Sequence, residues 1–210
     1  MLVKDVMKRP VITIGPEATL HEAHRLMWEK GIRHLPVVDA RGELVGILTD
    51  RDIRLATSNL RENPLPCDAK VHEAMTRPVL TADPLDPVED AARLMREEKI
   101  GCLPVLEGKE LVGIITGIDL LDALIVLTGA TRPAGRLEVL LPDRPGELAR
   151  LTAFFAEKKI NIHSVLTYPV ADDRVMNVLR VETLEVRPLA EELRARGFEV
   201  VWPPEKPWSR

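Results

Sequence analysis

Two threonine–aspartate pairs, each with its members three positions apart, could bind a sugar phosphate. Thr49 and Asp52 follow an apolar run that predicts a strand, and Thr116 and Asp119 follow a second such run. Where a strand meets a helix, free backbone amides and the positive end of the helix dipole attract phosphate. The threonine hydroxyl can bind phosphate, and the aspartate can accept hydrogen bonds from both hydroxyls of a ribose. This chemistry indicates an adenosine-type site without a glycine-rich phosphate loop.

The same spacing also has a purely structural explanation. A threonine followed three positions later by an acidic residue is an ordinary helix start, in which the two side chains cap exposed backbone amides. For one pair alone this explanation would be favoured. Because the pair recurs at the corresponding point of two related segments, the sequence favours ligand binding and keeps capping as the alternative.

Both pairs belong to an internal repeat. Residues 3–53 and 71–120 are imperfect copies of one unit, and the match extends through Ile32–Val38 and Ile100–Leu106. Self-similarity of this kind indicates the architecture before any single motif is weighed. Each copy predicts the order strand, helix, strand, strand, helix, with a hairpin between the two later strands.

Helix-start signals support this order. Thr19 and Glu22 form a capping box ahead of a helix that is predicted to stop at Gly31. In the second copy the helix is expected to start with Asp86 and to have Pro87 in its first position. Each helix precedes the strand pair that leads to one threonine–aspartate pair.

The last third of the chain has a different pattern. Residues 136–204 predict strand, helix, strand, strand, helix, strand, which is a ferredoxin-like βαββαβ unit. Its second strand is expected over 161–168, and its second helix is expected to start with Pro188 and to end before Gly197. The predicted fold class is therefore α+β.

Composition and charge argue against several function classes. The 29 basic and 33 acidic residues leave a net charge of −4, which gives no long-range attraction to nucleic acid or an anionic membrane. The start has no apolar signal region, and the apolar run Leu120–Ala130 is too short to span a bilayer and contains Asp122. Cys67 and Cys102 are isolated, which fits a reducing compartment. We expect a soluble, cytoplasmic protein.

Catalytic and metal-binding patterns are weak. His21 and His24 are three positions apart and could ligate a metal, but no third ligand is marked, so solvated or packed histidines are favoured. No nucleophile, base and orienting acid form a familiar motif. We therefore expect no cofactor, no metal site and no catalytic activity.

The repeat resembles the CBS domain family, and its tandem arrangement resembles a CBS pair, or Bateman module. The resemblance rests on the early proline followed by Thr13 or Thr81, on the Leu-Pro-Val strands, and on the Gly-x-x-Thr-x-x-Asp junctions. It implies CBS domains over 1–57 and 71–128, each a β-α-β-β-α unit, joined by a linker over 58–70.

The resemblance also implies a ligand. In CBS domains the corresponding threonine and aspartate hold phosphate and ribose, and the adenine lies against the first strand and the Leu-Pro-Val segment. AMP, ADP, ATP or a related adenosyl compound is therefore the implied ligand. The implied residues are Thr13, Leu35, Pro36, Thr49 and Asp52 in the first copy and Thr81, Leu103, Pro104, Thr116 and Asp119 in the second.

The copies differ where phosphate charge would be neutralised. Guanidinium groups suit this task because they bind phosphate in a bidentate manner. We predict that a phosphorylated nucleotide prefers the first cleft, and that the second binds a less charged ligand or stays empty. The two clefts of a CBS pair share residues, so each also depends on the other copy. Arg33, His34, Arg51 and Arg54 of the first copy correspond to Gly101, Cys102, Ile118 and Leu121 of the second.

Residues 136–204 resemble an ACT domain, through the runs Asp143–Ala149 and Lys159–Ile162. A linker over 129–135 precedes it, and 205–210 form a tail. ACT domains usually bind small effectors, often amino acids, between the first turn of one subunit and the second strand of its neighbour. The alternative is a tight turn and an ordinary strand start, in a domain that only pairs subunits. The implied effector residues are Asp143, Arg144, Gly146, Asn161 and Ile162.

A CBS pair followed by an ACT domain is similar to the bacterial acetoin-utilisation regulatory proteins. The sequence thus predicts a non-catalytic sensor that is a homodimer and acts on an unknown protein target, without nucleic acid or membrane as partner. Two alternatives stay open: a structural interaction module with vestigial clefts, and a regulatory subunit of a separately encoded enzyme.

Overall fold

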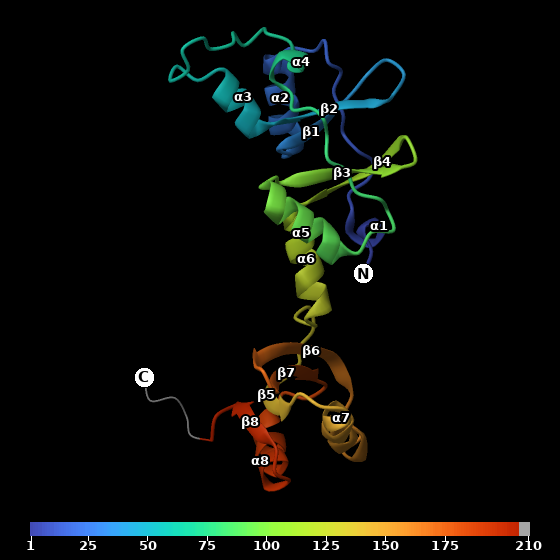
Figure 1. Cartoon of the computed structure of the whole chain (residues 1–210), viewed down its shortest axis with the longest axis vertical. Coiled ribbons are helices and arrows are strands. Elements are labelled where there is room, and N and C mark those ends of the chain that lie inside the picture. The colour runs from blue at the N-terminus through green and yellow to red at the C-terminus, as the bar shows by residue number, and fades with distance from the viewer. Residues whose placement is uncertain (206–210) are drawn as a thin grey trace. The chain divides into compact units, whose positions relative to one another are not determined.

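The computed structural model describes residues 1–205, and Figure 1 follows the course of the chain. The chain divides into two compact units, Met1–Ala123 and a second that starts at Leu124, which are described separately. Of the predicted tail over 205–210, all but Glu205 lies outside the described residues.

The first unit holds both copies of the repeat, and in each copy a helix packs on a two-stranded antiparallel hairpin. The helices are amphipathic because Leu20, Ala23 and Met27 are buried on one face of the first, as are their counterparts in the second. The first copy contains α2 (Leu20–Lys30), β1 (His34–Val38), β2 (Leu44–Thr49) and α3 (Asp50–Ala56), and the second contains α5 (Val88–Glu98), β3 (Cys102–Glu107), β4 (Glu110–Thr116) and α6 (Gly117–Leu127).

The leading strand of each copy is shorter than expected. It is reduced to one parallel bridge, Ile14 to Val37 in the first copy and Ala82 to Val105 in the second. Pro10 and Pro16 flank Ile14 and have no amide hydrogen to extend the pairing. Ahead of these segments lie two short helices, α1 (Val3–Val6) and α4 (Val71–Ala74).

The start of the second-copy helix also differs from the expectation. Pro87 is extended and is the N-cap, so α5 begins at Val88 rather than at Pro87. The carboxylate of Asp86 accepts a hydrogen bond from the amide of Asp83, at 2.8 Å, and stabilises the preceding turn. In the first copy, Thr19 and Glu22 do form the predicted capping box.

The two copies exchange their leading segments. α1 buries Val3 in the core of the second copy, together with Leu103 and Ile115. α4 buries Val71 in the core of the first copy, together with Leu35. Each copy therefore completes the hydrophobic core of the other.

Backbone pairing fixes the exchanged segments. Lys8 forms an antiparallel bridge with Ile114 of β4, and Thr76 forms the same bridge with Ile47 of β2. In each bridge one N–H···O bond is 2.8 Å long and the other 3.1 Å. Lys8 and Thr76 thus occupy corresponding places, each beside the strand that leads to a threonine–aspartate pair.

The second unit is the predicted ferredoxin-like βαββαβ fold. Its antiparallel sheet has the order β6-β7-β5-β8, and Figure 1 shows α7 and α8 on the same side of it. Leu137, Phe154, Leu179 and Leu193 are fully buried between sheet and helices. The elements are β5 (Gly135–Pro142), α7 (Glu147–Glu157), β6 (Ile162–Ala171), β7 (Arg174–Val181), α8 (Val186–Ala195) and β8 (Glu199–Trp202), so that β6 is longer than expected and α8 begins before Pro188.

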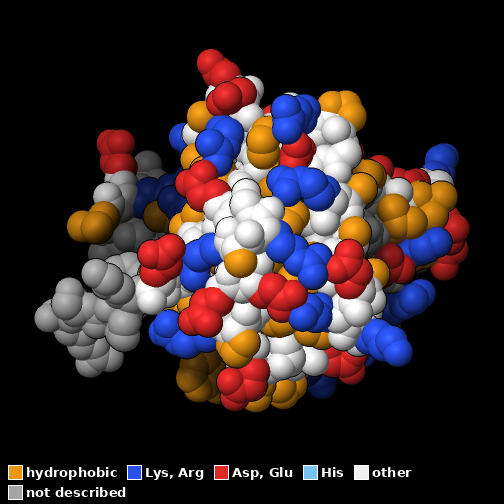
Figure 2. Space-filling view, turned by 90° about the horizontal axis from the view of Figure 1, so that it is seen from below, with side chains coloured by type: hydrophobic (Ala, Val, Ile, Leu, Met, Phe, Trp, Pro, Cys, Tyr) orange, Lys and Arg blue, Asp and Glu red, His pale blue; other side chains and the backbone are white. Residues whose placement is uncertain are grey.

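Figure 2 shows acidic and basic side chains interspersed over the face in view, without a large area of one sign. This face therefore offers no extended basic surface to a polyanion. Within residues 1–205, no helix combines the length and the hydropathy needed to cross a bilayer.

Candidate functional site

Thr49 and Asp52 form a reciprocal cap at the start of α3. The Thr49 hydroxyl accepts a hydrogen bond from the amide of Asp52 at 3.1 Å, and Asp52 Oδ2 accepts from the amide and hydroxyl of Thr49 at 2.8 and 2.7 Å. The capping explanation is therefore confirmed for this pair. Asp52 is half-buried, and no partner to its other oxygen, Oδ1, occurs among the described residues. The pair can cap the helix and still present one carboxylate oxygen to a ligand.

Thr116 and Asp119 repeat this arrangement at the start of α6, with a longer amide contact of 3.5 Å and one added partner. Asp119 Oδ2 again accepts from the amide and hydroxyl of Thr116, at 2.8 and 2.7 Å. The second oxygen, Oδ1, lies 3.3 Å from the ammonium nitrogen of Lys8, and the Asp119 side chain is only 2% exposed. Both carboxylate oxygens of the second copy are therefore engaged within the chain.

The two copies meet where β1 and β3 begin. A Cβ atom on Gly101 would lie 2.9 Å from His34 Nε2, so the His34 ring packs directly against the backbone of the second copy. Burial lowers the pKa of His34, and the nearby carboxylate of Asp50 only partly offsets this. His34 is consequently neutral at neutral pH and can supply hydrogen bonds but little positive charge.

Cys102 takes the place of His34 in the second copy, and it is buried. Burial raises the pKa of its thiol to about 12, and the charge of Asp52 adds to this effect. Cys102 is therefore an inert packing residue and no nucleophile. Because the charge of Asp52 affects the pKa of Cys102, Asp52 of the first copy lies near the second copy.

The other residues that were predicted to bind the nucleotide differ in how deeply they are buried. Leu35 and Leu103 are fully buried in the two cores, so their side chains pack rather than face a ligand. The carbonyl oxygen of Pro36 accepts from the amide of Ile14, and that of Pro104 from Ala82. Thr13 and Thr81, each one position before these bridges, are half-exposed.

Two of the three arginines predicted to neutralise phosphate in the first copy are available to a ligand. Arg33 and Arg51 are exposed, and the described part of the chain contains no acidic group within ion-pair distance of either. Arg54 instead pairs with Asp50 at 3.0 Å, one helical turn away. Two free guanidinium groups therefore remain for a phosphate.

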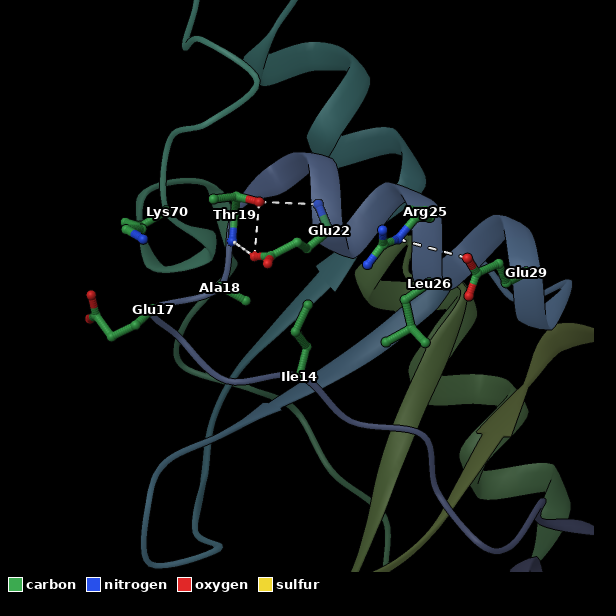
Figure 3. A pocket seen from close by; sticks show the side chains of 9 residues that line it. All are labelled: Ile14, Glu17, Ala18, Thr19, Glu22, Arg25, Leu26, Glu29 and Lys70. Atoms are coloured by element: carbon green, nitrogen blue, oxygen red, sulfur yellow. Dashed lines mark hydrogen bonds and ion pairs between the residues drawn. The ribbon is translucent and has the colours of Figure 1, made fainter.

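A cavity of about 640 Å³ lies elsewhere, along α2, and none of the predicted residues lines it. Figure 3 shows Glu22 bound to Thr19, and Arg25 beside Glu29 on the same helix. A cavity of about 300 Å³ lies at the corresponding place on α5, and of the predicted residues only Leu103 lines it. Neither cavity could be predicted from the sequence, since these positions have the pattern of an ordinary solvated helix face.

The predicted effector residues lie at opposite ends of the second unit's sheet. Ile162 pairs with Val181, which pairs with Gly135 at the start of β5. Asp143 follows Pro142 at the far end of β5. The eight residues of this strand place the two groups about 25 Å apart. One chain alone does not bring them together.

The turn that carries the first group is well ordered by ion pairs. Arg144 and Arg150 both bind Glu147, with nitrogen–oxygen distances of 2.7 and 2.8 Å. The hydrogen bonds from Arg144 and then Arg150 lower the pKa of Glu147. Gly146 has a φ of 93° at the start of α7, which favours glycine. An effector carboxylate at this turn would compete with Glu147 for Arg144.

Family comparisons agree with this architecture. The CBS domain model matches residues 3–59 and 71–126, and the ACT domain model matches residues 135–198. The chain is a CBS-domain protein with a C-terminal ACT domain. The resemblance that the sequence motifs carried is thereby confirmed for both parts.

Two solved structures are similar to the CBS pair. The CBS domain pair of protein MJ0100, in complex with 5′-methylthioadenosine and S-adenosyl-L-methionine, is 33% identical with a TM-score of 0.55, and the match covers 63% of this chain and 98% of that one. A Vibrio cholerae protein assigned to acetoin utilization (AcuB) is 34% identical with a TM-score of 0.54, and the match again covers 63% and 98%.

CBS sequences of this kind also occur within enzymes. Homoserine O-acetyltransferase of Methanococcoides burtonii is 42% identical over 119 residues, which are 56% of this chain. The match spans only 23% of the length of that enzyme. The similarity therefore concerns less than a quarter of the acetyltransferase.

Proposed function

We propose that the chain is a non-catalytic regulatory protein whose CBS pair binds an adenine nucleotide or another adenosyl compound. The observation that carries this proposal is the similarity to a CBS pair solved with two adenosyl ligands, over nearly the whole length of that pair. The half-buried Asp52, with one carboxylate oxygen free, supports a ribose contact in the first copy.

The first cleft is the preferred site for a phosphorylated ligand. Arg33 and Arg51 belong to the first copy and have no acidic partner within residues 1–205, whereas Gly101 and Ile118 stand at their places in the second. His34 contributes hydrogen bonds there instead of charge, because its pKa is lowered. Thr13 and Thr49 lie on the segments that border the same corner.

The ACT domain binds a small effector, such as an amino acid, between two chains. The 25 Å separation within one chain, about the length of β5, supports this because only a second copy can bring Asn161 and Ile162 to Asp143, Arg144 and Gly146. A homodimer is the arrangement that this site requires.

Calorimetric titration of adenosyl compounds against Asp52→Asn tests the nucleotide site. The substitution keeps the side-chain shape and an oxygen for capping but removes the charge. We expect at least a tenfold loss of affinity, about 1.4 kcal/mol, because hydrogen bonds to a charged group are the stronger ones. Asp5→Asn is the matched control, since Asp5 caps α1 in the same way by accepting from the amide of Leu2 at 2.9 Å. Equal affinity of the two variants would remove Asp52 from the site.

A second candidate is a regulatory subunit of a separately encoded enzyme. The observation that favours it is a similar CBS pair within a much longer acetyltransferase, of which this chain matches 23%. Affinity purification of the full chain from its own cells, with and without added adenosyl compound, tests this candidate. Reproducible capture of one enzyme that depends on the compound would support it.

A structural module with vestigial clefts would instead show no change in melting temperature with any adenosyl compound.

A further inference from the structure

The second copy contains an internal contact that the first copy lacks. The Lys8 ammonium lies 3.3 Å from Asp119 Oδ1, while Asp119 Oδ2 is held by Thr116. We propose that Lys8 closes the second cleft to adenosyl ligands by occupying the carboxylate that would bind ribose. This inference rests on the proposed function and specifies which cleft performs it, namely that of Asp52.

The burial of Asp119 supports this proposal. Only 2% of its side chain is exposed, so neither oxygen can receive the hydroxyl hydrogens of a ribose from solvent. A carboxylate has about four lone-pair positions. Here two are used by Thr116 and one faces Lys8, which leaves too few for both ribose hydroxyls. A ligand at the second cleft must therefore displace Lys8.

The counterpart in the first copy shows what Lys8 adds. Thr76 has the same antiparallel bridge to Ile47 that Lys8 has to Ile114, and these isoleucines hold corresponding positions two residues before Thr49 and Thr116. Threonine is short and uncharged, so it cannot form an ion pair with Asp52. The difference between lysine and threonine at one structural position thus accounts for one free and one engaged carboxylate.

Lys8 is suited to block the cleft without being part of the core. Its side chain is 68% exposed, so Lys8 lies at the surface while its ammonium contacts Asp119. Its backbone, not its side chain, makes the bridge to β4. Replacement of the side chain should therefore open the cleft and preserve the fold.

The test exchanges the two counterpart residues. Calorimetric titration with 5′-methylthioadenosine, which has no phosphate, measures the number of sites without attraction between phosphate and the basic residues. We expect one site per chain for the wild type, two for Lys8→Thr, and at least a tenfold weaker first site for Thr76→Lys. The double exchange should bind one ligand, now through Asp119. Lys4→Thr is the control for loss of a charge, because Lys4 lies on the exposed face of α1 and has no ion-pair partner among the described residues.

The outcomes separate this inference from the proposed function. A single site in Lys8→Thr, with the wild-type melting temperature, overturns the role of Lys8 and leaves the proposed function intact. Two sites in the wild type do the same. No binding to the wild type or to any variant, repeated with AMP and S-adenosyl-L-methionine, overturns the proposed function and the inference together.

Discussion

At the scale of single residues, each threonine–aspartate pair caps a helix. Its surroundings decide whether a carboxylate oxygen is left for a ligand. Both pairs cap a helix with nearly identical hydrogen bonds. They differ in burial and in what approaches the second carboxylate oxygen, which is Lys8 at Asp119 and no described protein group at Asp52. Residue type and spacing are thus insufficient to identify a site, because a residue distant in sequence sets its availability.

The lowered pKa of His34 predicts that the stability of the fold depends on pH. Burial holds its pKa below the ordinary value near 6.5, which the unfolded chain retains. As pH falls below about 6.5, the unfolded state binds a proton that the folded state does not, so the free energy of unfolding decreases. Stability from this residue is fully present above pH 6.5 and is lost as pH falls toward the folded pKa.

Thermal melts at pH 7.5 and pH 5.5 measure this effect. We expect a smaller difference between the two melting temperatures for His34→Gln than for the wild type. His24→Gln, at an exposed position of α2, is the control and should behave as the wild type does. An unchanged difference in His34→Gln would mean that other groups cause the pH dependence.

At the scale of elements, each hairpin leaves room for the methionine that ends the short leading helix of the other copy. A Cβ atom on Gly113 would lie 2.3 Å from Met7 Sδ, and one on Gly46 would lie 2.3 Å from Met75 Sδ. The leading strands are short because prolines limit their pairing with β1 and β3, whereas the exchanged segments pair with β2 and β4. The hairpins therefore depend on sequence from both copies.

Gly113→Ala tests this fit. We expect a loss of about 1–3 kcal/mol in the free energy of unfolding, because overpacking displaces Met7. The loss should be smaller when Met7→Ala is also present, and a double-mutant cycle in urea measures that coupling. Gly117→Ala is the control, because a Cβ atom there meets nothing within 4 Å. Equal losses at Gly113 and Gly117 would argue against a packing contact.

At the scale of the whole molecule, the order of domains and most elements could be predicted from local patterns. Repeats, caps and apolar periodicity are encoded in neighbouring residues, as at Thr19 and Glu22. The Lys8–Asp119 pair and the exchange of Val3 and Val71 could not be predicted, because they join residues far apart in the chain. The separation of Asp143 from Ile162 also follows only from the strand register.

This separation yields a prediction about assembly. If an effector site needs two chains, Asp143→Ala and Asn161→Ala should each abolish the melting-temperature shift caused by an amino-acid effector. Mixed after partial unfolding and refolding, the two variants form heterodimers in which one site has both groups intact. We expect part of the shift to return, with light scattering giving twice the 23.5 kDa mass of one chain. No recovery in a dimeric mixture would place the two groups in separate sites.

The exchange of leading segments makes the CBS pair indivisible. Either half, produced alone as a fragment, would lack the helix that seals it and would carry a spare helix with nothing to cover. A protease that nicks the exposed stretch around Asn63 would cut the backbone but not the association, since Val3 and Val71 would still anchor each fragment in the other. The two copies therefore resemble an interlocked dimer whose halves happen to be joined by a linker in one polypeptide.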